Sequence, residues 1–316
     1  MRTSVFRKLN EMKKIAIGFI VAVLGLNSAQ AQNQPQFSQY MYNPMAFNPG
    51  YAGTGGVMSA LASYRTQWVG LDGAPQTISF SGQSPLGEYG GLGVNIFNDQ
   101  IGPSKETTAM INASYTIVDY DNDVKYSFGV SAGGRQLQVD FNKLNIEHGG
   151  DTSLTGSLNR FSPNVGVGLF VHTEEWYVGL SVPYILNTKF YDDVASSFTA
   201  SKPQFYGVAG YVFEINPELK FKPATMIRAI SGAPLSIDVS ANFLISDMVT
   251  LGASYRWDAA ISALAGFQIS EDLQIGYSYD FDTNKLGNYN SGSHEIFIRF
   301  DLFSKNTNRY VNPRFF

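Results

Sequence analysis

Hydrophobic and polar residues alternate almost strictly between residues 234 and 282. The apolar positions of the first stretch are Leu235, Ile237, Val239, Ala241, Phe243 and Ile245, and its polar positions are Ser236, Asp238, Ser240, Asn242 and Ser246. Residues 251–258 and 273–282 repeat the pattern. A period of two is that of an extended strand with one apolar and one polar face. Segments of about ten residues with Gly and terminal aromatic residues are typical of a transmembrane β-barrel.

The same pattern predicts about fourteen strands along the chain, an even number as bacterial single-chain barrels require. The predicted strands cover residues 57–66, 76–83, 89–98, 106–118, 124–134, 160–172, 175–183, 204–215, 218–230, 234–246, 248–257, 259–270, 272–281 and 293–303. We therefore expect an all-β, up-and-down antiparallel barrel in a membrane. A soluble β-sandwich with a Tyr-rich core is the alternative.

The links between the predicted strands support a barrel. Every second link is short, and these lie at residues 85–87, 120–123, 173–174, 216–217, 247 and 271. The longer links, at 67–75, 99–105, 135–159, 184–203 and 282–292, all fall at the opposite end. Barrels of the outer membrane have short periplasmic turns and long extracellular loops. Residues 136–147 also alternate, which leaves an extension of the flanking strand above the membrane as an alternative.

Charged residues fall on the face opposite the apolar one. They are Arg65, Lys125, Arg135, Lys220, Lys222, Arg228, Arg256, Arg299, Asp238, Asp258, Asp280, Glu295 and Asp301. A charge facing lipid at mid-membrane costs up to about 2–4 kcal/mol. We therefore expect these side chains to pair inside the lumen. Pro223 interrupts one strand and predicts a β-bulge there.

Composition excludes several classes of protein. The chain has 316 residues, 44% of them hydrophobic, and no cysteine. Disulfides, thiolate nucleophiles and Cys-ligated metals are therefore excluded. No apolar run after residue 26 reaches the roughly 20 residues that a spanning helix needs.

The N-terminus predicts export. Lys13 and Lys14 precede the apolar run 15–26, and Ala29-Gln30-Ala31 fits a signal-peptide cleavage site, so residues 1–31 are a signal peptide. They carry five of the 22 basic and one of the 26 acidic residues, which leaves 17 basic and 25 acidic residues and a net charge of −8. This balance argues against nucleic acid as a partner. We expect the mature chain in the outer membrane.

Residues 32–56 are rich in Pro, amides and aromatic rings, which makes a strand or a flexible linker a poor interpretation. We expect this segment to pack inside the barrel or under its periplasmic mouth, with 57–303 as the barrel and 304–316 as a periplasmic tail. Residues 50–56 are Gly-rich, but no strand precedes them and no helix follows, so a turn is expected and not a phosphate loop. Small residues such as Gly90, Gly91, Gly93, Gly166 and Gly168 allow other backbone to approach the wall.

Candidate catalytic and metal-binding residues are few. Asp119, Asp121 and Asp123 have the spacing of a Ca²⁺ site but lack the Gly and the distal Glu of an EF-hand, so a solvated turn is expected. Only three histidines exist, and His172 falls on the predicted lumen face, whereas an outer-membrane Ser-His hydrolase needs its pair on the outer wall. We expect no enzyme activity, no cofactor and no metal.

Several motifs go beyond the fold class. They are Pro-Gln-Phe-Ser-Gln-Tyr at 35–40, Asn-Pro at 43–44, Asn-Pro-Gly-Tyr-Ala-Gly at 48–53, Tyr-Arg-Thr-Gln-Trp-Val-Gly at 64–70, Gly-Ala-Pro-Gln-Thr at 73–77 and Arg-Tyr-Val-Asn-Pro-Arg-Phe-Phe at 309–316. The mature chain resembles the PorP/SprF family from end to end. The two N-terminal motif groups are the specific ones.

The resemblance implies an outer-membrane component of the type IX secretion system of Bacteroidota, which supports gliding motility in some members. Its implied partners are the C-terminal domain of secreted cargo, such as a surface adhesin, and periplasmic secretion subunits. Residues expected to anchor the plug or bind partners are Phe37, Tyr40, Tyr42, Arg65, Gln67, Trp68, Phe190, Tyr191, Tyr310, Phe315 and Phe316. The alternative is a FadL-like channel for hydrophobic small molecules, which needs an apolar lumen pocket and a lateral opening.

Overall fold

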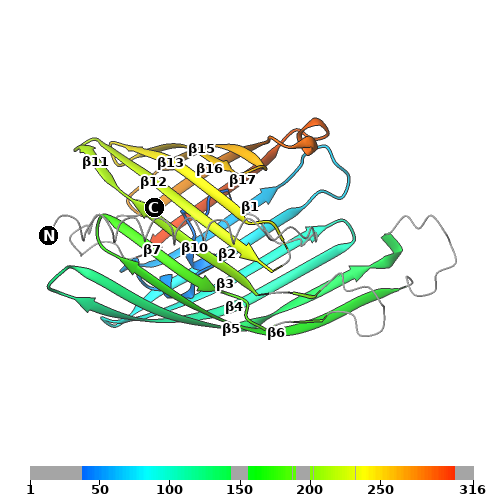
Figure 1. Cartoon of the computed structure of the whole chain (residues 1–316), viewed down its shortest axis with the longest axis horizontal. Helices are drawn as coiled ribbons and strands as arrows, with labels where there is room; N and C mark the ends of the chain where they lie inside the picture. Colours follow the sequence, from blue (N-terminus) through cyan, green and yellow to red (C-terminus); the bar gives the residue numbers. More distant parts are fainter. Residues whose placement is uncertain are drawn as a thin grey trace, which may run out of the picture.

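A computed structural model describes residues 38–143, 156–186, 188–189, 200–201, 203–231 and 233–302. This part of the chain forms a closed antiparallel barrel with strongly tilted strands (Figure 1). Its wall strands are β1 (Met58–Thr66), β2 (Gln76–Leu86), β3 (Gly90–Ile101), β4 (Ser104–Asp119), β5 (Val124–Asp140), β6 (Ser157–His172), β7 (Trp176–Val182), β10 (Gln204–Tyr211), β11 (Phe213–Asn216), β12 (Leu219–Ile230), β13 (Ser236–Ile245), β14 (Val249–Arg256), β15 (Ala260–Gln268), β16 (Leu273–Asp282) and β17 (Ser293–Leu302). Consecutive β10 and β11 both pair with β12, so the described wall has 14 strands. The predicted fold class is confirmed.

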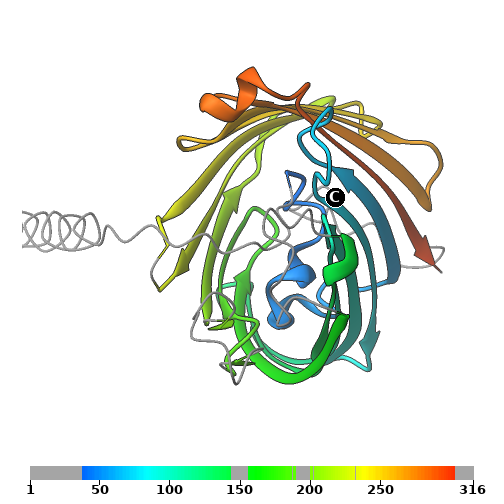
Figure 2. The same cartoon turned by 90° about the vertical axis from the view of Figure 1, so that its right-hand side faces the viewer.

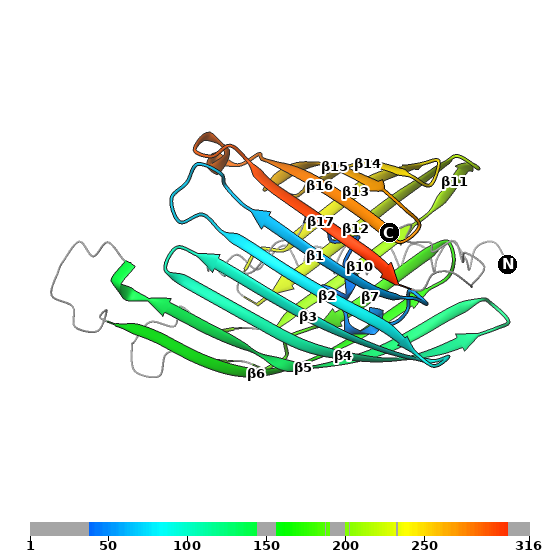
Figure 3. The same cartoon turned by 180° about the vertical axis from the view of Figure 1, so that it is seen from behind.

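The wall closes because its first and last strands pair. β1 pairs with β17 along its whole length, which places Arg65 directly opposite Glu295 (Figure 3). A separate two-stranded sheet consists of β8 (Thr188–Lys189) and β9 (Ala200–Ser201). The described helical turns are short: η1 (Pro44–Ala46), η2 (Pro49–Tyr51), η3 (Phe141–Lys143) and η5 (Lys285–Asn288). Among the described residues, no helix has the length and apolarity needed to cross a membrane.

The two faces of the wall differ as the alternation predicts. Large apolar side chains point outward, and Ile78, Ile111 and Leu180 are 58–66% exposed. Small polar residues such as Ser127 and Asn242 are fully buried on the inner face. In a β-sandwich the apolar faces would be buried against each other, so that alternative is wrong.

The links follow the predicted alternation of length. We call the end with links 67–75, 141–156, 183–203, 231–235 and 283–292 the loop end, and the opposite end the turn end. The link predicted at 99–105 shrinks to Gly102-Pro103, because β3 and β4 extend toward each other. β5 continues to Asp140 opposite Ser157, so the strand extension is the correct alternative for this region.

Pro223 does not create a bulge. Pro223 pairs with Ala241 in an unbroken register between β12 and β13. On the other side, β10 and β11 keep one register across the gap at Val212. Proline removes one backbone donor without inserting a residue, so it interrupts the ladder and leaves the register intact. The register shift lies instead between Glu214 and Asn216.

Residues 38–56, which we call the plug segment, lie inside the ring of strands (Figure 2). Ser38 is held near the loop end, by β16 and β17. Gly53 donates to Gln83 near the turn end. The segment therefore descends through the lumen before β1 starts back up the wall.

Candidate functional site

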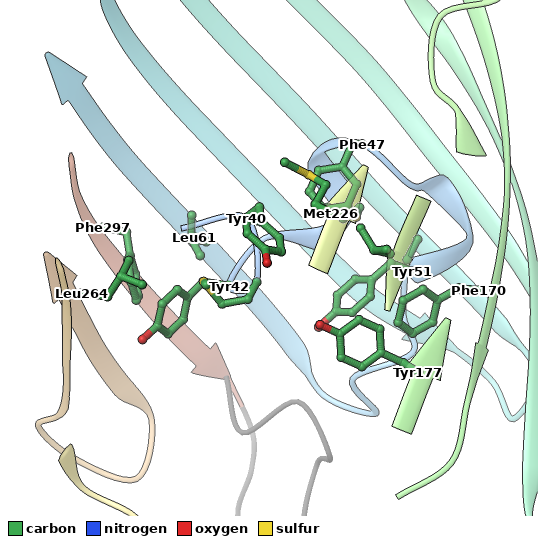
Figure 4. Packing of buried hydrophobic residues seen from close by; sticks show 14 residues of the cluster. Tyr40, Tyr42, Phe47, Tyr51, Leu61, Phe170, Tyr177, Met226, Leu264 and Phe297 are labelled. Carbon is green, nitrogen blue, oxygen red and sulfur yellow. The ribbon is translucent and has the colours of Figure 1, made fainter. Parts of the chain in front are cut away.

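The plug segment supplies half of the main cluster of buried apolar side chains in the lumen. They form one cluster with residues of the wall: Tyr40, Met41, Tyr42, Met45, Phe47, Tyr51 and Ala52 from the plug, and Leu61, Phe170, Tyr177, Val208, Met226, Leu264 and Phe297 from the strands (Figure 4). Tyr42 packs on Phe297 with ring centroids 4.3 Å apart. Tyr51 meets Phe170 edge to face at 5.2 Å. Aromatic pairs of this kind add about 0.5–1.5 kcal/mol beyond area burial.

Tyr40 and Tyr42, two of the predicted site residues, are both buried in this cluster. The Tyr40 hydroxyl lies 3.1 Å from Ser240 Oγ of β13. The rings thus face the wall, and their polar ends meet polar lumen positions.

The lower half of the plug segment lies against glycine residues of β3, β5 and β6. A Cβ at Gly129 would overlap the carbonyl of Pro49 and the amide of Gly50. A Cβ at Gly91 would overlap the carbonyl of Ala52, and one at Gly168 would overlap Asn48. Only glycine permits this approach of backbone to wall. The predicted approach of other backbone is confirmed at Gly91 and Gly166, which lie against the carbonyls of Ala52 and Pro183. At Gly93 and Gly168 the close atoms belong to the side chains of Met45 and Asn48, and Gly90 faces Leu86 of its own hairpin.

Asn48 is the polar anchor of this lower half. Its side chain is fully buried, Nδ2 donates to the Leu169 carbonyl at 3.0 Å, and Oδ1 accepts from the Gly50 amide at 2.9 Å. The second bond caps η2 and fixes the turn that places Pro49 against the wall.

Asn48→Ala is expected to loosen the plug segment. It leaves the Gly50 amide without its acceptor in a buried site, at a cost of about 1–3 kcal/mol. Hydrogen exchange of amides 44–54 should become faster in the folded barrel. Asn122→Ala, in an exposed turn, is the control and should leave this exchange unchanged. Equal protection in wild type and Asn48→Ala would contradict the assignment.

Arg65 organises the upper anchor, which we call the Arg65 cluster. Its guanidinium donates to Asp280 Oδ2 at 2.6 Å and to Glu295 Oε2 at 3.1 Å. Ser38 completes the cluster: its amide donates to Glu295 Oε2, and its Oγ donates to Asp280 Oδ2 at 2.5 Å. All four residues are at most 3% exposed. One plug residue is therefore tied to three wall strands.

Gln67 and Trp68 do not contact the plug segment through a described hydrogen bond. The amide of Trp68 donates to Ser293 Oγ at 3.2 Å, and residues 69 and 291–292 exchange backbone hydrogen bonds. Trp68 has φ of +49°, which is uncommon for a residue with a side chain. These residues join two loops at the loop end.

The remaining predicted site residues, Phe37, Phe190, Tyr191, Tyr310, Phe315 and Phe316, lie outside the described residues. Sequence reasoning missed Ser38 and Asn48 as anchors, and it did not pair Arg65 with Asp280 and Glu295. The Asn-Pro-Gly at 48–50 is a turn signal that could have identified Asn48.

A small cavity of about 50 Å³, which we call the lumen cavity, lies against the plug segment toward the loop end. Tyr40, Ala46 and Phe47 form its floor, and Arg135, Arg228 and Arg256 line its walls. Glu106 and Asp238 also line it. Beside the plug segment, this cavity is thus small and combines aromatic with charged side chains.

A polar groove lies at the loop end, outside the plugged lumen. It has a volume of about 470 Å³, and Lys105, Gln138, Asp140 and Asn159 are among the residues that line it. The extended ends of β4, β5 and β6 form it, so it stands on rigid strands. Residues 138–140 and 157–159 of its lining belong to the long link that the sequence predicts at 135–159.

Clusters of residues that could bind a metal ion or catalyse a reaction are scarce in the described part of the chain. No group of three or more His, Asp or Glu suits a metal ion there. Asp119 is used within its own turn, where it accepts from Asp121 and Asn122. His294 Nδ1 bonds to the Tyr277 hydroxyl at 2.6 Å, and His172 is buried in the lumen beside Phe170.

Comparison with known proteins gives one family. A family model described as type IX secretion system membrane protein PorP/SprF matches residues 29–300. Among curated proteins, no relative matches the chain.

Solved structures of outer-membrane barrels are distantly similar. The outer membrane protein Omp33 of Acinetobacter baumannii has 8% identity and a TM-score of 0.47, over 78% of this chain and 100% of that one. The toluene transporter TbuX of Ralstonia pickettii has 11% identity and a TM-score of 0.48, over 88% of this chain and 99% of that one. At this level of similarity neither structure informs the function of this chain.

Proposed function

Because this chain belongs to the PorP/SprF family of type IX secretion system membrane proteins, we propose that it is a plugged outer-membrane barrel that docks or anchors secreted cargo. In this role the loop end faces the cell surface and meets the C-terminal domain of cargo or a surface adhesin. The turn end faces the periplasm and meets subunits of the secretion and gliding machinery. The barrel itself catalyses no reaction.

The filled lumen is the observation that supports docking most directly. The plug segment forms hydrogen bonds to opposite sides of the wall. Ser38 bonds to β16 and β17, and Asn48 bonds to β6. Ser181 of β7 and Asn95 of β3 donate to the plug carbonyls of Phe47 and Met45. A barrel braced from within is a rigid platform, and rigid elements position binding surfaces well.

Transport of hydrophobic molecules is less well supported. It would require an apolar lumen pocket large enough for the ligand, whereas the lumen cavity has a volume of only about 50 Å³ and five of its 13 lining residues are charged. A lateral opening at Pro223 would require a break in the wall, but β12 keeps its register with β13 at that residue.

Co-purification of the full chain from detergent-extracted membranes tests the proposal. We expect recovery of type IX secretion subunits or of a large adhesin, identified by mass spectrometry. An unrelated outer-membrane barrel with the same tag is the control and should recover neither. Recovery of a bound apolar small molecule, with no secretion subunit or adhesin, would contradict docking and favour transport.

A further inference from the structure

The lumen cavity contains one arginine without a carboxylate partner in the described part of the chain. Arg135 donates through Nε to Glu106 Oε1 at 2.9 Å, and its terminal nitrogen contacts the same oxygen. Arg256 donates through Nε to Asp238 Oδ1 at 2.7 Å. Arg228 forms no ion pair there. Both lining carboxylates are therefore already paired, and the lining carries one excess positive charge.

The surroundings of Arg228 favour a ligand that carries negative charge. Arg228 lies directly opposite Tyr206 in the pairing of β12 with β10, and the Tyr206 hydroxyl donates to Gln204 Oε1 at 2.8 Å. A guanidinium held beside aromatic rings in a narrow cavity has lost part of its hydration, and a charge-assisted hydrogen bond would restore it.

We propose that the lumen cavity binds a carboxylate group through Arg228. The planar guanidinium fork matches the two oxygens of a carboxylate. The volume of about 50 Å³ exceeds the ~10–15 Å³ that one water molecule requires, which leaves room for a small anionic group. The carboxylate comes either from a small free ion or from an acidic peptide end that enters from the loop end. The site does not depend on the proposed docking role.

The floor of the site is the plug segment itself. Phe47 stacks on Tyr206 with ring centroids 5.6 Å apart, and Tyr206 lies opposite Arg228 on the neighbouring strand. A bound carboxylate therefore lies one residue away from the plug segment. Occupancy of the cavity should stabilise the plugged form, because the ligand binds only when the floor is in place.

Thermal unfolding of the full chain in detergent tests the site. Sodium acetate at about ten times its dissociation constant should raise the unfolding midpoint by about 2–4 °C over sodium chloride at equal ionic strength. Arg228→Gln should abolish this shift. It should not lower the midpoint in chloride, because no described carboxylate loses a partner. Lys220→Gln, which removes a cation paired with Asp247 at the turn end, is the matched control and should keep the acetate shift.

A capped tripeptide with a free C-terminal carboxylate and its amide distinguish the two sources. A shift with acetate supports a small ion, and a shift with the acid peptide alone supports a peptide carboxylate. The proposal is overturned if neither carboxylate shifts the midpoint at 100 mM, a concentration of order ten times a weak Kd. It is equally overturned if Arg228→Gln keeps the shift or if the amide acts like the acid.

Discussion

Replacing Arg65 with methionine is expected to lower the free energy of unfolding by about 3–5 kcal/mol, the largest single effect in this barrel. The substitution leaves Asp280 and Glu295 buried without their shared cation. It also removes the donor that bonds to Ser38 Oγ at 2.9 Å, so the start of the plug segment loses its attachment. Urea unfolding in lipid vesicles, followed by tryptophan fluorescence, measures the change.

Two further variants separate a lost ion pair from a general packing defect. Arg65→Met combined with Asp280→Asn and Glu295→Gln should regain most of the stability, because a neutral cluster carries no uncompensated charge. Lys220→Met breaks a pair with the half-exposed Asp247 and should cost no more than about 1 kcal/mol. If the single and triple variants were equally destabilised, the electrostatic explanation would be wrong.

Forcing the plug segment off the wall is expected to open the lumen to ions. In Gly129→Val the new side chain occupies the space of Pro49 and Gly50, so the lower half of the plug segment must move away from β5. The wild-type protein should pass almost no current in planar lipid bilayers. The variant should pass at least about tenfold more, because wide barrels without a filled lumen hold an aqueous channel.

Two other substitutions control this experiment. Gly91→Val meets the carbonyl of Ala52 from a different strand and should also raise the current. Gly207→Val lies on the same outward face as Phe205, where a Cβ meets only Leu180 at an ordinary 3.6 Å. It should leave the barrel closed. If folded Gly129→Val and Gly91→Val passed no more current than the wild-type protein, the plug segment would not be what seals the lumen.

The strands were predictable because the environment imposes a period of two on each of them. Lipid outside and polar groups inside sort the side chains residue by residue, so Ile78 and Ser79 already reveal the two faces. The limits of β4, β5 and β6 were less predictable, since these strands extend beyond the predicted ends. The β-bulge at Pro223 was wrongly predicted. In a sequence, a proline that only removes a backbone N–H donor cannot be told from a proline that marks an inserted residue.

The anchors of the plug segment were harder to predict. Arg65 and Glu295 become neighbours only because β1 pairs with β17, and no local pattern gives the register between the two ends of a chain. Ser38 and Asn48 are ordinary polar residues whose burial depends on the completed wall. The resemblance to PorP/SprF located the right motifs but did not give their contacts.

The pairing of Ser38 with Glu295 spans 257 positions, and this has a consequence for biogenesis. The carboxylates that capture the start of the plug are on β16 and β17, the last strands to emerge during export. In a nascent chain the start of the plug segment therefore stays unattached until β16 and β17 have joined the wall. Attachment of Ser38 and completion of the wall are therefore coupled, so a chain without β16 and β17 cannot fix the start of its plug segment.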